Sequence, residues 1–434
     1  MPEPSSVGPV EASERVHLLD ALRGFALLGV FVSNSLSWFS GRSLLPREQA
    51  KALTASTLET VVNSLYAFFV DQKFITLFSL LFGMGFALQM TRAEGRGASI
   101  VPVYRRRLLA LFGIGLVHMF GVWVGDILST YAMVGFVLLL FRKRSDRTVL
   151  TWVAVLFVVL PLTLSIAQRY GPELLHGKEA AEAAAKATRE EEGAHRTAFF
   201  TGLSSHSVVA SQQANAVFAW QNLPNPGRPI WLSIILGRFL LGLWAGRHRV
   251  LEEVERHRKL LIRVMAWGLA VGSAVATLSL VLNLMNRNVP GGGPLGQLSP
   301  PAWMVGMRTL REVGFLFMGT GYAAAFALLF QKERWRKVLG VLTPVGRMAL
   351  TLYLMQSVVS IWLYDGWGLG LVGNTPPSRT VLLCLGVFAA QVAFSHWWLA
   401  RFRFGPVEWL WRSLTYGRAQ PMRLAPAREA PAAH

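Results

Sequence analysis

Residues 108–141 read LLALFGIGLVHMFGVWVGDILSTYAMVGFVLLLF, and His118 and Asp126 are the only residues among them that are charged or titrate near neutral pH. As one helix, these 34 residues would be about 51 Å long, whereas the hydrocarbon core of a bilayer is about 30 Å thick. The dipeptide Gly125-Asp126 favours a tight turn. The stretch therefore predicts two short transmembrane helices joined near residue 125, and with them an all-α polytopic membrane protein.

Composition supports a membrane protein and excludes other classes. Apolar residues make up 53% of the 434 and charged residues 15%, whereas soluble domains have about 25% charged residues. The net charge of +19 could indicate nucleic-acid binding. Because the bases form short clusters between apolar runs, membrane topology explains them, and we expect no nucleic acid partner. The single cysteine, Cys384, excludes an internal disulfide and a cysteine-based metal site, and we predict no metal.

Eight further apolar runs bring the predicted number of transmembrane helices to ten. Lys and Arg cluster in the linkers after the second, fourth, sixth and eighth helices and after the tenth. All five clusters lie on one side of a ten-helix protein, and the positive-inside rule makes that side and both termini cytoplasmic. The eight runs are residues 18–38, 74–90, 149–167, 230–245, 264–284, 314–330, 348–364 and 380–400.

The sequence divides into a helical domain with short flanking segments. Residues 1–14 form a polar tail, and the first apolar run lacks a signal-peptide cleavage site, so we expect it to be retained. The transmembrane domain covers 15–400 and includes a long outer loop, 168–229, in which the Ala/Glu-rich residues 178–192 favour a solvated helix. We expect an irregular outer loop at 288–301. Residues 401–423 form an interfacial segment with a helix at 407–414, and 424–434 a disordered tail.

The ionisable residues of the spans are candidates for chemistry, since charges there are rare and often functional. The predicted topology places His118 and Asp126 toward the outer leaflet. A histidine near a carboxylate is the minimum requirement for a general base, so His118 is the predicted catalytic base and Asp126 its orienting carboxylate. The alternatives are an interhelical hydrogen-bonding histidine and a turn aspartate.

Other polar residues on the outer side are candidates for substrate binding. Asp71 and Lys73 could equally form an interfacial ion pair. Arg311 and Glu312 are adjacent and do not face each other on a helix, so each needs another partner. Arg238 lies near mid-membrane and must be paired or face water. We expect an outward-opening cavity shared by the catalytic pair, Asn34 and Asp71. The substrate-binding set is Asn34, Asp71, Lys73, Arg238, Arg311 and Glu312.

Three stretches carry a resemblance to a known family. They are LDALRGFALLG (19–29), ending at Asn34; FGMGFA (82–87) with GLVH (115–118) and GDIL (125–128); and GRMALT (346–351) with YLMQS (353–357) and FGPVEWLWR (404–412). Together they span about residues 15–420 and resemble the YeiB-like family of bacterial membrane proteins, domain of unknown function 418. Leu352 stands where such sequences often carry Asn. The resemblance implies a multi-pass protein of the bacterial cytoplasmic membrane.

The first stretch is also distantly similar to the transmembrane acyltransferase superfamily. There an Arg-Gly pair, here Arg23-Gly24, opens the first helix, and many members carry a histidine at the position of Asn34. Some heparan-acetylating relatives have Asn there and use a histidine elsewhere, which makes His118 the substitute. The resemblance implies an acyltransferase-like protein that acts on a cell-envelope acceptor, with acetyl-CoA or an acyl-lipid as donor.

Two other classes remain open on the sequence. A transporter or exporter of a small molecule would use the polar residues to line a path, and a non-catalytic membrane scaffold would use them for packing alone. Neither the substrate nor the oligomeric state follows from the sequence.

Overall fold

The computed structural model describes residues 17–95, 99–287 and 302–424. Helices account for almost all regular structure in these ranges, apart from one isolated bridge between Phe402 and Arg423. The all-α fold is therefore confirmed. The tail predicted at 1–14, the irregular loop predicted at 288–301 and residues 425–434 lie outside the described residues.

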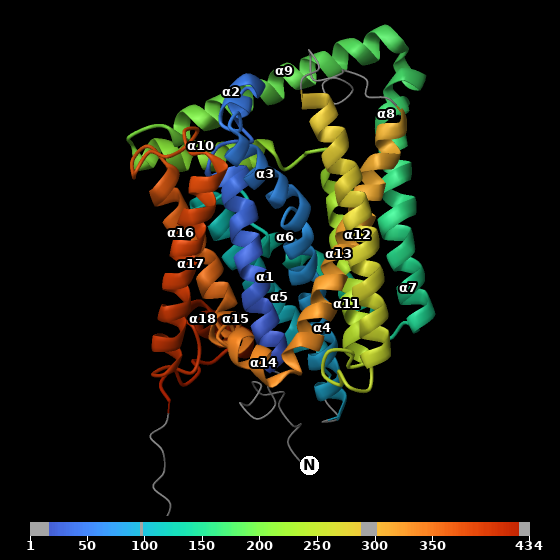
Figure 1. Ribbon diagram of the computed structural model, residues 1–434, viewed down its shortest axis with the longest axis vertical. Coiled ribbons are helices and arrows are strands. Elements are labelled where there is room, and N and C mark those ends of the chain that lie inside the picture. The colour runs from blue at the N-terminus through green and yellow to red at the C-terminus, as the bar shows by residue number, and fades with distance from the viewer. Residues whose placement is uncertain (1–16, 96–98, 288–301, 425–434) are drawn as a thin grey trace, which may run out of the picture.

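Long helices stand side by side as an upright bundle (Figure 1). The chain leaves α5 at Gly121 and enters α6 at Leu128, which is where the sequence predicts the turn. Each of the ten predicted spans lies on one of these helices, although α13 begins twelve residues before the predicted 314 and α8 ends nine residues after the predicted 167. The helices are α1 (His17–Asn34, continued by a π-helix, Ser35–Phe39), α4 (Lys73–Gly95), α5 (Val101–Gly121), α6 (Leu128–Leu138), α7 (Asp146–Ala154) with α8 (Leu160–His176), α11 (Arg228–Arg247), α12 (Arg258–Arg287), α13 (Ala302–Phe330), α16 (Ala349–Tyr364) and α17 (Pro377–Leu399).

Seven helical segments in the described part of the chain are long and apolar enough to cross a bilayer, and two apolar helices, Leu128–Phe141 and Ala349–Tyr364, are shorter. The helix α5 is in neither group, because residues 105–107 are three consecutive arginines. The membrane class is thus confirmed, while the count of ten and the cytoplasmic termini stay predictions.

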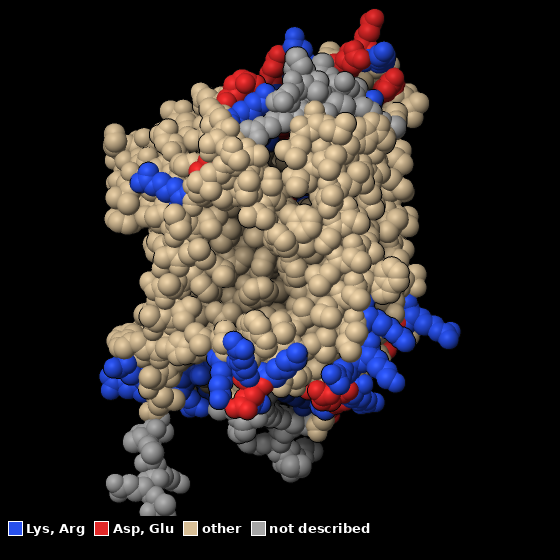
Figure 2. Space-filling model, in the orientation of Figure 1, with Lys and Arg blue, Asp and Glu red and all other residues tan. Residues whose placement is uncertain are grey.

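Charged side chains on the surface are unevenly distributed along the length of the bundle. Figure 2 shows Lys and Arg gathered around the end of the bundle where α1 begins, which we call the basic end, and a wide uncharged belt above it. The uncharged belt has the appearance expected of a lipid-facing surface.

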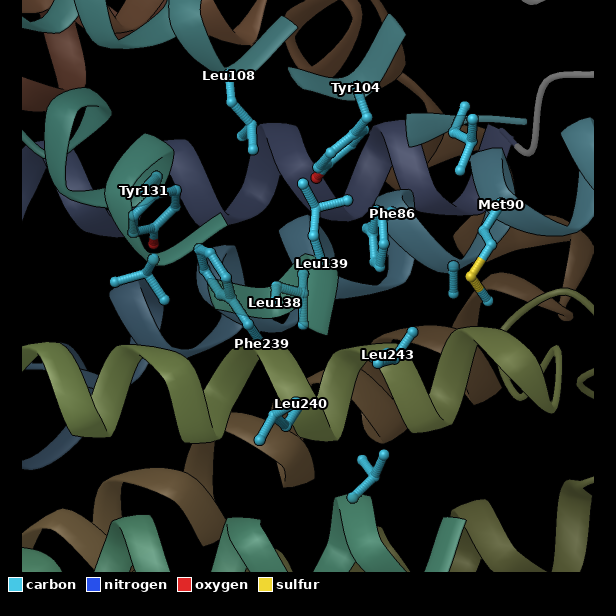
Figure 3. Close-up of a cluster of buried hydrophobic side chains, with 14 of the residues drawn as sticks. Phe86, Met90, Tyr104, Leu108, Tyr131, Leu138, Leu139, Phe239, Leu240 and Leu243 are labelled. Atoms are coloured by element: carbon cyan, nitrogen blue, oxygen red, sulfur yellow. The ribbon is translucent and has the colours of Figure 1, made fainter. Parts of the chain in front are cut away.

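Close contact between α4 and α11 forms the centre of the bundle. A Cβ on Gly83 would lie 2.1 Å from the carbonyl oxygen of Phe239, and one on Gly242 would lie 2.1 Å from that of Leu80. Small residues let membrane helices approach this closely. Phe239 of α11 then packs against Tyr131 of α6, with ring centroids 5.0 Å apart (Figure 3).

Helices of the 168–229 region cover the end opposite the basic end. The helix α9 (Lys178–Leu203) crosses over the bundle, and α10 (Val208–Gln221) packs beneath it (Figure 1). The helix predicted at 178–192 is part of α9. Four shorter helices complete the fold: α2 (Arg47–Ala52), α3 (Thr57–Phe69), α14 (Glu333–Gly340) and α15 (Thr343–Arg347).

The C-terminal helix α18 (Pro406–Tyr416) contains the helix predicted at 407–414. Its buried Glu408 accepts hydrogen bonds from the backbone N–H groups of Leu350 (2.7 Å) and Thr351 (3.1 Å) and from the Thr351 hydroxyl (2.5 Å). A carboxylate at the first turn of α16 satisfies N–H groups that have no partner within the helix. Two separated parts of the GRMALT…FGPVEWLWR motif therefore meet at this contact.

The predicted orientation can be measured with reporter fusions. Fusions after Arg147 and Lys259, at the basic end, should report the cytoplasm, and a fusion within residues 182–192 of α9 should report the opposite side. A cytoplasmic signal from α9 would contradict the orientation.

Candidate functional site

His118 and Asp126 form a buried pair near the end of α5. The His118 Nδ1 lies 2.9 Å from Asp126 Oδ1, and the two side chains are 2% and 0% exposed. An ionised carboxylate only accepts hydrogen bonds, so in a pair of carboxylate and neutral imidazole Nδ1 carries the proton and Nε2 presents its lone pair. The other carboxylate oxygen accepts the backbone N–H of Ser129 at 2.7 Å, which fixes its orientation.

A glycine one turn before His118 makes room for this pair. A Cβ on Gly115 would lie 2.3 Å from the backbone nitrogen of Ser129 and 2.9 Å from Asp126 Oδ2. Any larger residue would push the start of α6 away from α5. In the sequence GLVH, the absence of a side chain at Gly115 therefore allows α6 to approach α5 next to His118.

The second ring nitrogen of His118, Nε2, is available for a hydrogen bond to a substrate. Nε2 is buried and makes no hydrogen bond with any residue that the structure describes. The rings of Tyr353 and Trp123 flank the imidazole, with centroids 5.3 and 6.2 Å away. A buried imidazole with one nitrogen held by a carboxylate and the other unpartnered has the arrangement of a general base.

Tyr353 also lines a cavity of about 310 Å³, together with Ile127 and Leu128, the two residues after Asp126. The cavity lies between α1, α4, α5, α6, α16 and α18. His118 is not among its lining residues but contacts one of them, Tyr353. Leu27 and Val30 of α1 line it as well, and Asn34 follows one turn later on the same helical face. The half-buried Asn34 is therefore on the cavity side of α1.

The remaining predicted residues form a separate ionic cluster between α3, α4, α11 and α13. The fully buried Arg238 donates to Glu312 Oε2 at 3.1 Å, and Arg311 lies 3.9 Å from Asp71. The predictions that Arg238 is paired and that Arg311 and Glu312 each have another partner are confirmed. Lys73 donates to the carbonyl oxygen of Ala67 at 2.6 Å. Asp71 pairs with Arg311 across helices, so the alternative of an Asp71–Lys73 ion pair is wrong.

The predicted outward-opening cavity shared by His118, Asp126, Asn34 and Asp71 is not found in the described part of the chain either, since none of these four residues lines the 310 Å³ cavity. A small cavity of about 50 Å³ is lined by Asp71, Lys73 and Arg311 and by neither His118 nor Asp126. The physical reason is that sequence gives the depth of a residue in the membrane but not the direction in which its helix face points. Residues of similar depth consequently fall into two sites.

Three site residues were missed by sequence reasoning. Tyr353 and Ser129 are described above, and neither is ionised near neutral pH. The third, Asn215 of α10, is 2% exposed. Its Oδ1 accepts the Val124 N–H at 2.7 Å and its Nδ2 donates to the Met119 carbonyl at 3.0 Å, so it holds the loop between His118 and Asp126. No sequence signal marks it within the outer loop.

A second contact fastens α10 near this site. The Ser211 hydroxyl donates to the buried Asp365 carboxylate at 2.5 Å. Burial raises the pKa of Asp365 to about 6, and the hydrogen bond from Ser211 acts in the opposite direction.

This contact predicts a pH dependence of stability. The folded pKa of Asp365 is above the ordinary aspartate value of about 3.9, so the folded protein holds the proton more tightly. Stability should fall as pH rises from about 4 to about 6, by on the order of 1–3 kcal/mol, and then stay level. In thermal unfolding measurements, the Asp365→Asn variant should not show this fall of stability with pH, whereas the Ser211→Ala variant should still show it. Equal pH profiles for wild type and Asp365→Asn would contradict the assignment.

These features define a polytopic all-α membrane protein with a buried histidine–aspartate pair beside a large cavity. A family model described as "Protein of unknown function (DUF418)" matches residues 245–418. The chain is 34% identical over 426 residues to "Uncharacterized protein YxaH" of Bacillus subtilis (strain 168), covering 96% of this chain and 98% of the relative. It is 27% identical over 435 residues to "Uncharacterized protein YeiB" of Escherichia coli (strain K12), covering 94% and 98%.

A further relative is an "Uncharacterized 39.9 kDa protein in amylase 3'region" of Bacillus acidopullulyticus, 28% identical over 424 residues, covering 96% and 98%. The chain belongs to the DUF418 family of YeiB-like membrane proteins. The similarity to these relatives extends over nearly the whole chain, as the three motif stretches predict.

Proposed function

We propose that this chain is an acyltransferase of the bacterial cytoplasmic membrane that modifies a cell-envelope acceptor. The observation that carries the proposal is the His118 imidazole, whose Nδ1 is held by Asp126 and whose buried Nε2 has no partner among the described residues. Burial of an unpaired acceptor costs free energy, and a substrate hydroxyl would recover it.

The chemistry follows from this geometry. Nε2 of His118 accepts the proton of an acceptor hydroxyl while the hydroxyl oxygen attacks the acyl carbonyl of the donor. The tetrahedral intermediate collapses to the new ester, and the leaving thiol or alcohol of the donor takes the proton from the imidazolium. Asp126 stabilises the transient positive charge and keeps the ring in place. Acetyl-CoA and an acyl-lipid both satisfy this balance.

Tyr353 links the cavity to the catalytic pair. Its side chain lines the cavity and its ring lies 5.3 Å from the imidazole, so we assign to it control of the approach of the acyl group to Nε2. We assign Asn34, on the cavity side of α1, to contact with the acyl carbonyl region. On the opposite side, α9 and α10 cover the site, and Asn215 of α10 holds the loop between His118 and Asp126.

A deletion strain tests the proposal. Envelope polymers and lipids from wild type, the deletion and the complemented strain would be compared by mass spectrometry for ester-linked acyl groups. We expect at least one acylated species to disappear in the deletion and to return on complementation. Identical acylation profiles would contradict the proposal.

An exporter is the second candidate, favoured by a cavity whose lining includes six arginines, while α9 and α10 cover the end of the bundle opposite the basic end. An exporter would carry an unmodified small molecule across and leave acylation unchanged. Accumulation of that molecule in the deletion strain, with an unchanged acylation profile, would favour it.

A further inference from the structure

The cavity beside Tyr353 has an unusual concentration of arginines at its other end. Six arginines line it, against two carboxylates, those of Asp20 and Glu408, so its lining carries four more positive than negative charges. The six come from different parts of the chain: Arg23, Arg92, Arg107, Arg347, Arg403 and Arg412.

The two carboxylates have partners of their own. Asp20 pairs with Arg23 at 2.7 Å, and Glu408 accepts hydrogen bonds from the amides and hydroxyl at the start of α16. Arg107 stacks on the Trp411 ring at 3.9 Å and lies within electrostatic reach of Arg412 and Arg23. Positive charges that line one cavity repel one another, and a bound polyanion relieves the repulsion.

The opposite end of the cavity has different chemistry. Phe78, Phe82 and Leu81 line it in α4, and Ile75 lies nearest the start of that helix. From Ile75 to Arg92 the cavity follows α4 for about 25 Å, most of the thickness of a bilayer core. One end therefore suits phosphate and the other suits an acyl chain.

We propose that the cavity binds an acyl donor whose head carries at least two phosphate charges, with the phosphates against the arginines at the basic end and the acyl group directed toward Tyr353. This proposal rests on the proposed acyl transfer and specifies its donor class. A guanidinium group can bind two phosphate oxygens at once, so a head with several phosphates suits this positively charged lining.

Two sources supply this chemistry: a soluble nucleotide-linked thioester such as acetyl-CoA, and an anionic phospholipid with several phosphates such as cardiolipin. Equilibrium binding of labelled acetyl-CoA to the purified full-length protein in detergent tests the first. Co-purification of cardiolipin from nanodiscs that contain it with phosphatidylethanolamine, measured by native mass spectrometry, tests the second.

Two cavity variants and one control sharpen both measurements. Arg107→Gln and Arg403→Gln should each weaken binding of the responding ligand about 10-fold, because charge-assisted hydrogen bonds are lost. Arg336→Gln, an exposed arginine of α14 outside the cavity lining, should change it less than 2-fold. Two variants are used because loss of the Arg107–Trp411 stacking could itself lower folding yield, and each is compared as folded monodisperse protein.

The possible results distinguish the proposed ligand site from the proposed function. Arginine-dependent binding of either ligand supports the proposal and identifies the source. Absence of binding by both ligands, or binding that the two cavity variants leave unchanged, overturns it. His118→Gln should bind like wild type; if binding depends on the arginines while envelope acylation survives loss of His118, the proposed function fails and the ligand site stands.

Discussion

Replacing His118 by Gln should lower acylation of the envelope acceptor at least 100-fold in cells that lack the native gene. The variant keeps a side chain of similar size beside Asp126 but has no ring nitrogen to accept the acceptor proton. General bases contribute roughly 10²–10⁴-fold to rate, which sets the expected range. Mass spectrometry of the envelope, normalised to the amount of variant protein in the membrane, measures the effect.

Two variants accompany this measurement. Asp126→Asn should reduce acylation less than His118→Gln, since it removes the charge that stabilises the imidazolium but keeps the shape. His396→Gln is the matched control, because His396 is exposed and its hydrogen-bond partner in the described part of the chain is the Val341 carbonyl, at 3.0 Å. A loss below tenfold in His118→Gln would show that the histidine serves packing.

Glu312→Leu should destabilise the folded protein by about 3–5 kcal/mol, because it leaves the buried charge of Arg238 without its carboxylate. Removing one partner of a buried ion pair lowers the stability of the folded protein more than removing both partners. The thermal unfolding midpoint of the purified protein in detergent would fall accordingly.

The double variant Arg238→Leu/Glu312→Leu is the control for this prediction. Without either charge, stability should recover most of the loss, since an apolar pair of similar volume is often neutral in a buried site. Equal stability of Glu312→Leu and wild type would mean that the 3.1 Å contact does not neutralise Arg238.

Much of the fold could be predicted from sequence because membrane helices satisfy one simple requirement. A helix that crosses the bilayer must be apolar for about 20 residues, and the 34-residue run at 108–141 had to break, which it does between Gly121 and Leu128. The Ala/Glu-rich helix within 178–203 followed from intrinsic propensity alone.

The site was only partly predictable. His118 and Asp126 are eight residues apart across a turn, so their 2.9 Å contact is local and the sequence could suggest it. Tyr353 reaches the same imidazole from a helix more than 200 residues away, and Asp71 finds Arg311 rather than Lys73. Such contacts depend on the rotation and neighbours of each helix, which hydropathy does not encode.

The arginine-lined cavity shows a second limit. The positive-inside rule accounts for all of its arginines except Arg23 as a topological signal, so nothing in the pattern sets those five apart from Arg334 or Arg336. Only packing of α1, α5 and α18 around one space distinguishes cavity arginines from surface ones.

Acyl transfer is measured most directly with purified full-length protein in liposomes, supplied with donor carrying a radiolabelled acetyl group and with unacylated envelope material from the deletion strain. Wild-type protein and His396→Gln should transfer label to the envelope fraction, and His118→Gln should transfer at least 100-fold less, as the proposed base catalysis by His118 requires. Transfer by His118→Gln at the wild-type rate, or no transfer by wild type with either acetyl-CoA or a labelled acyl-lipid, would contradict it.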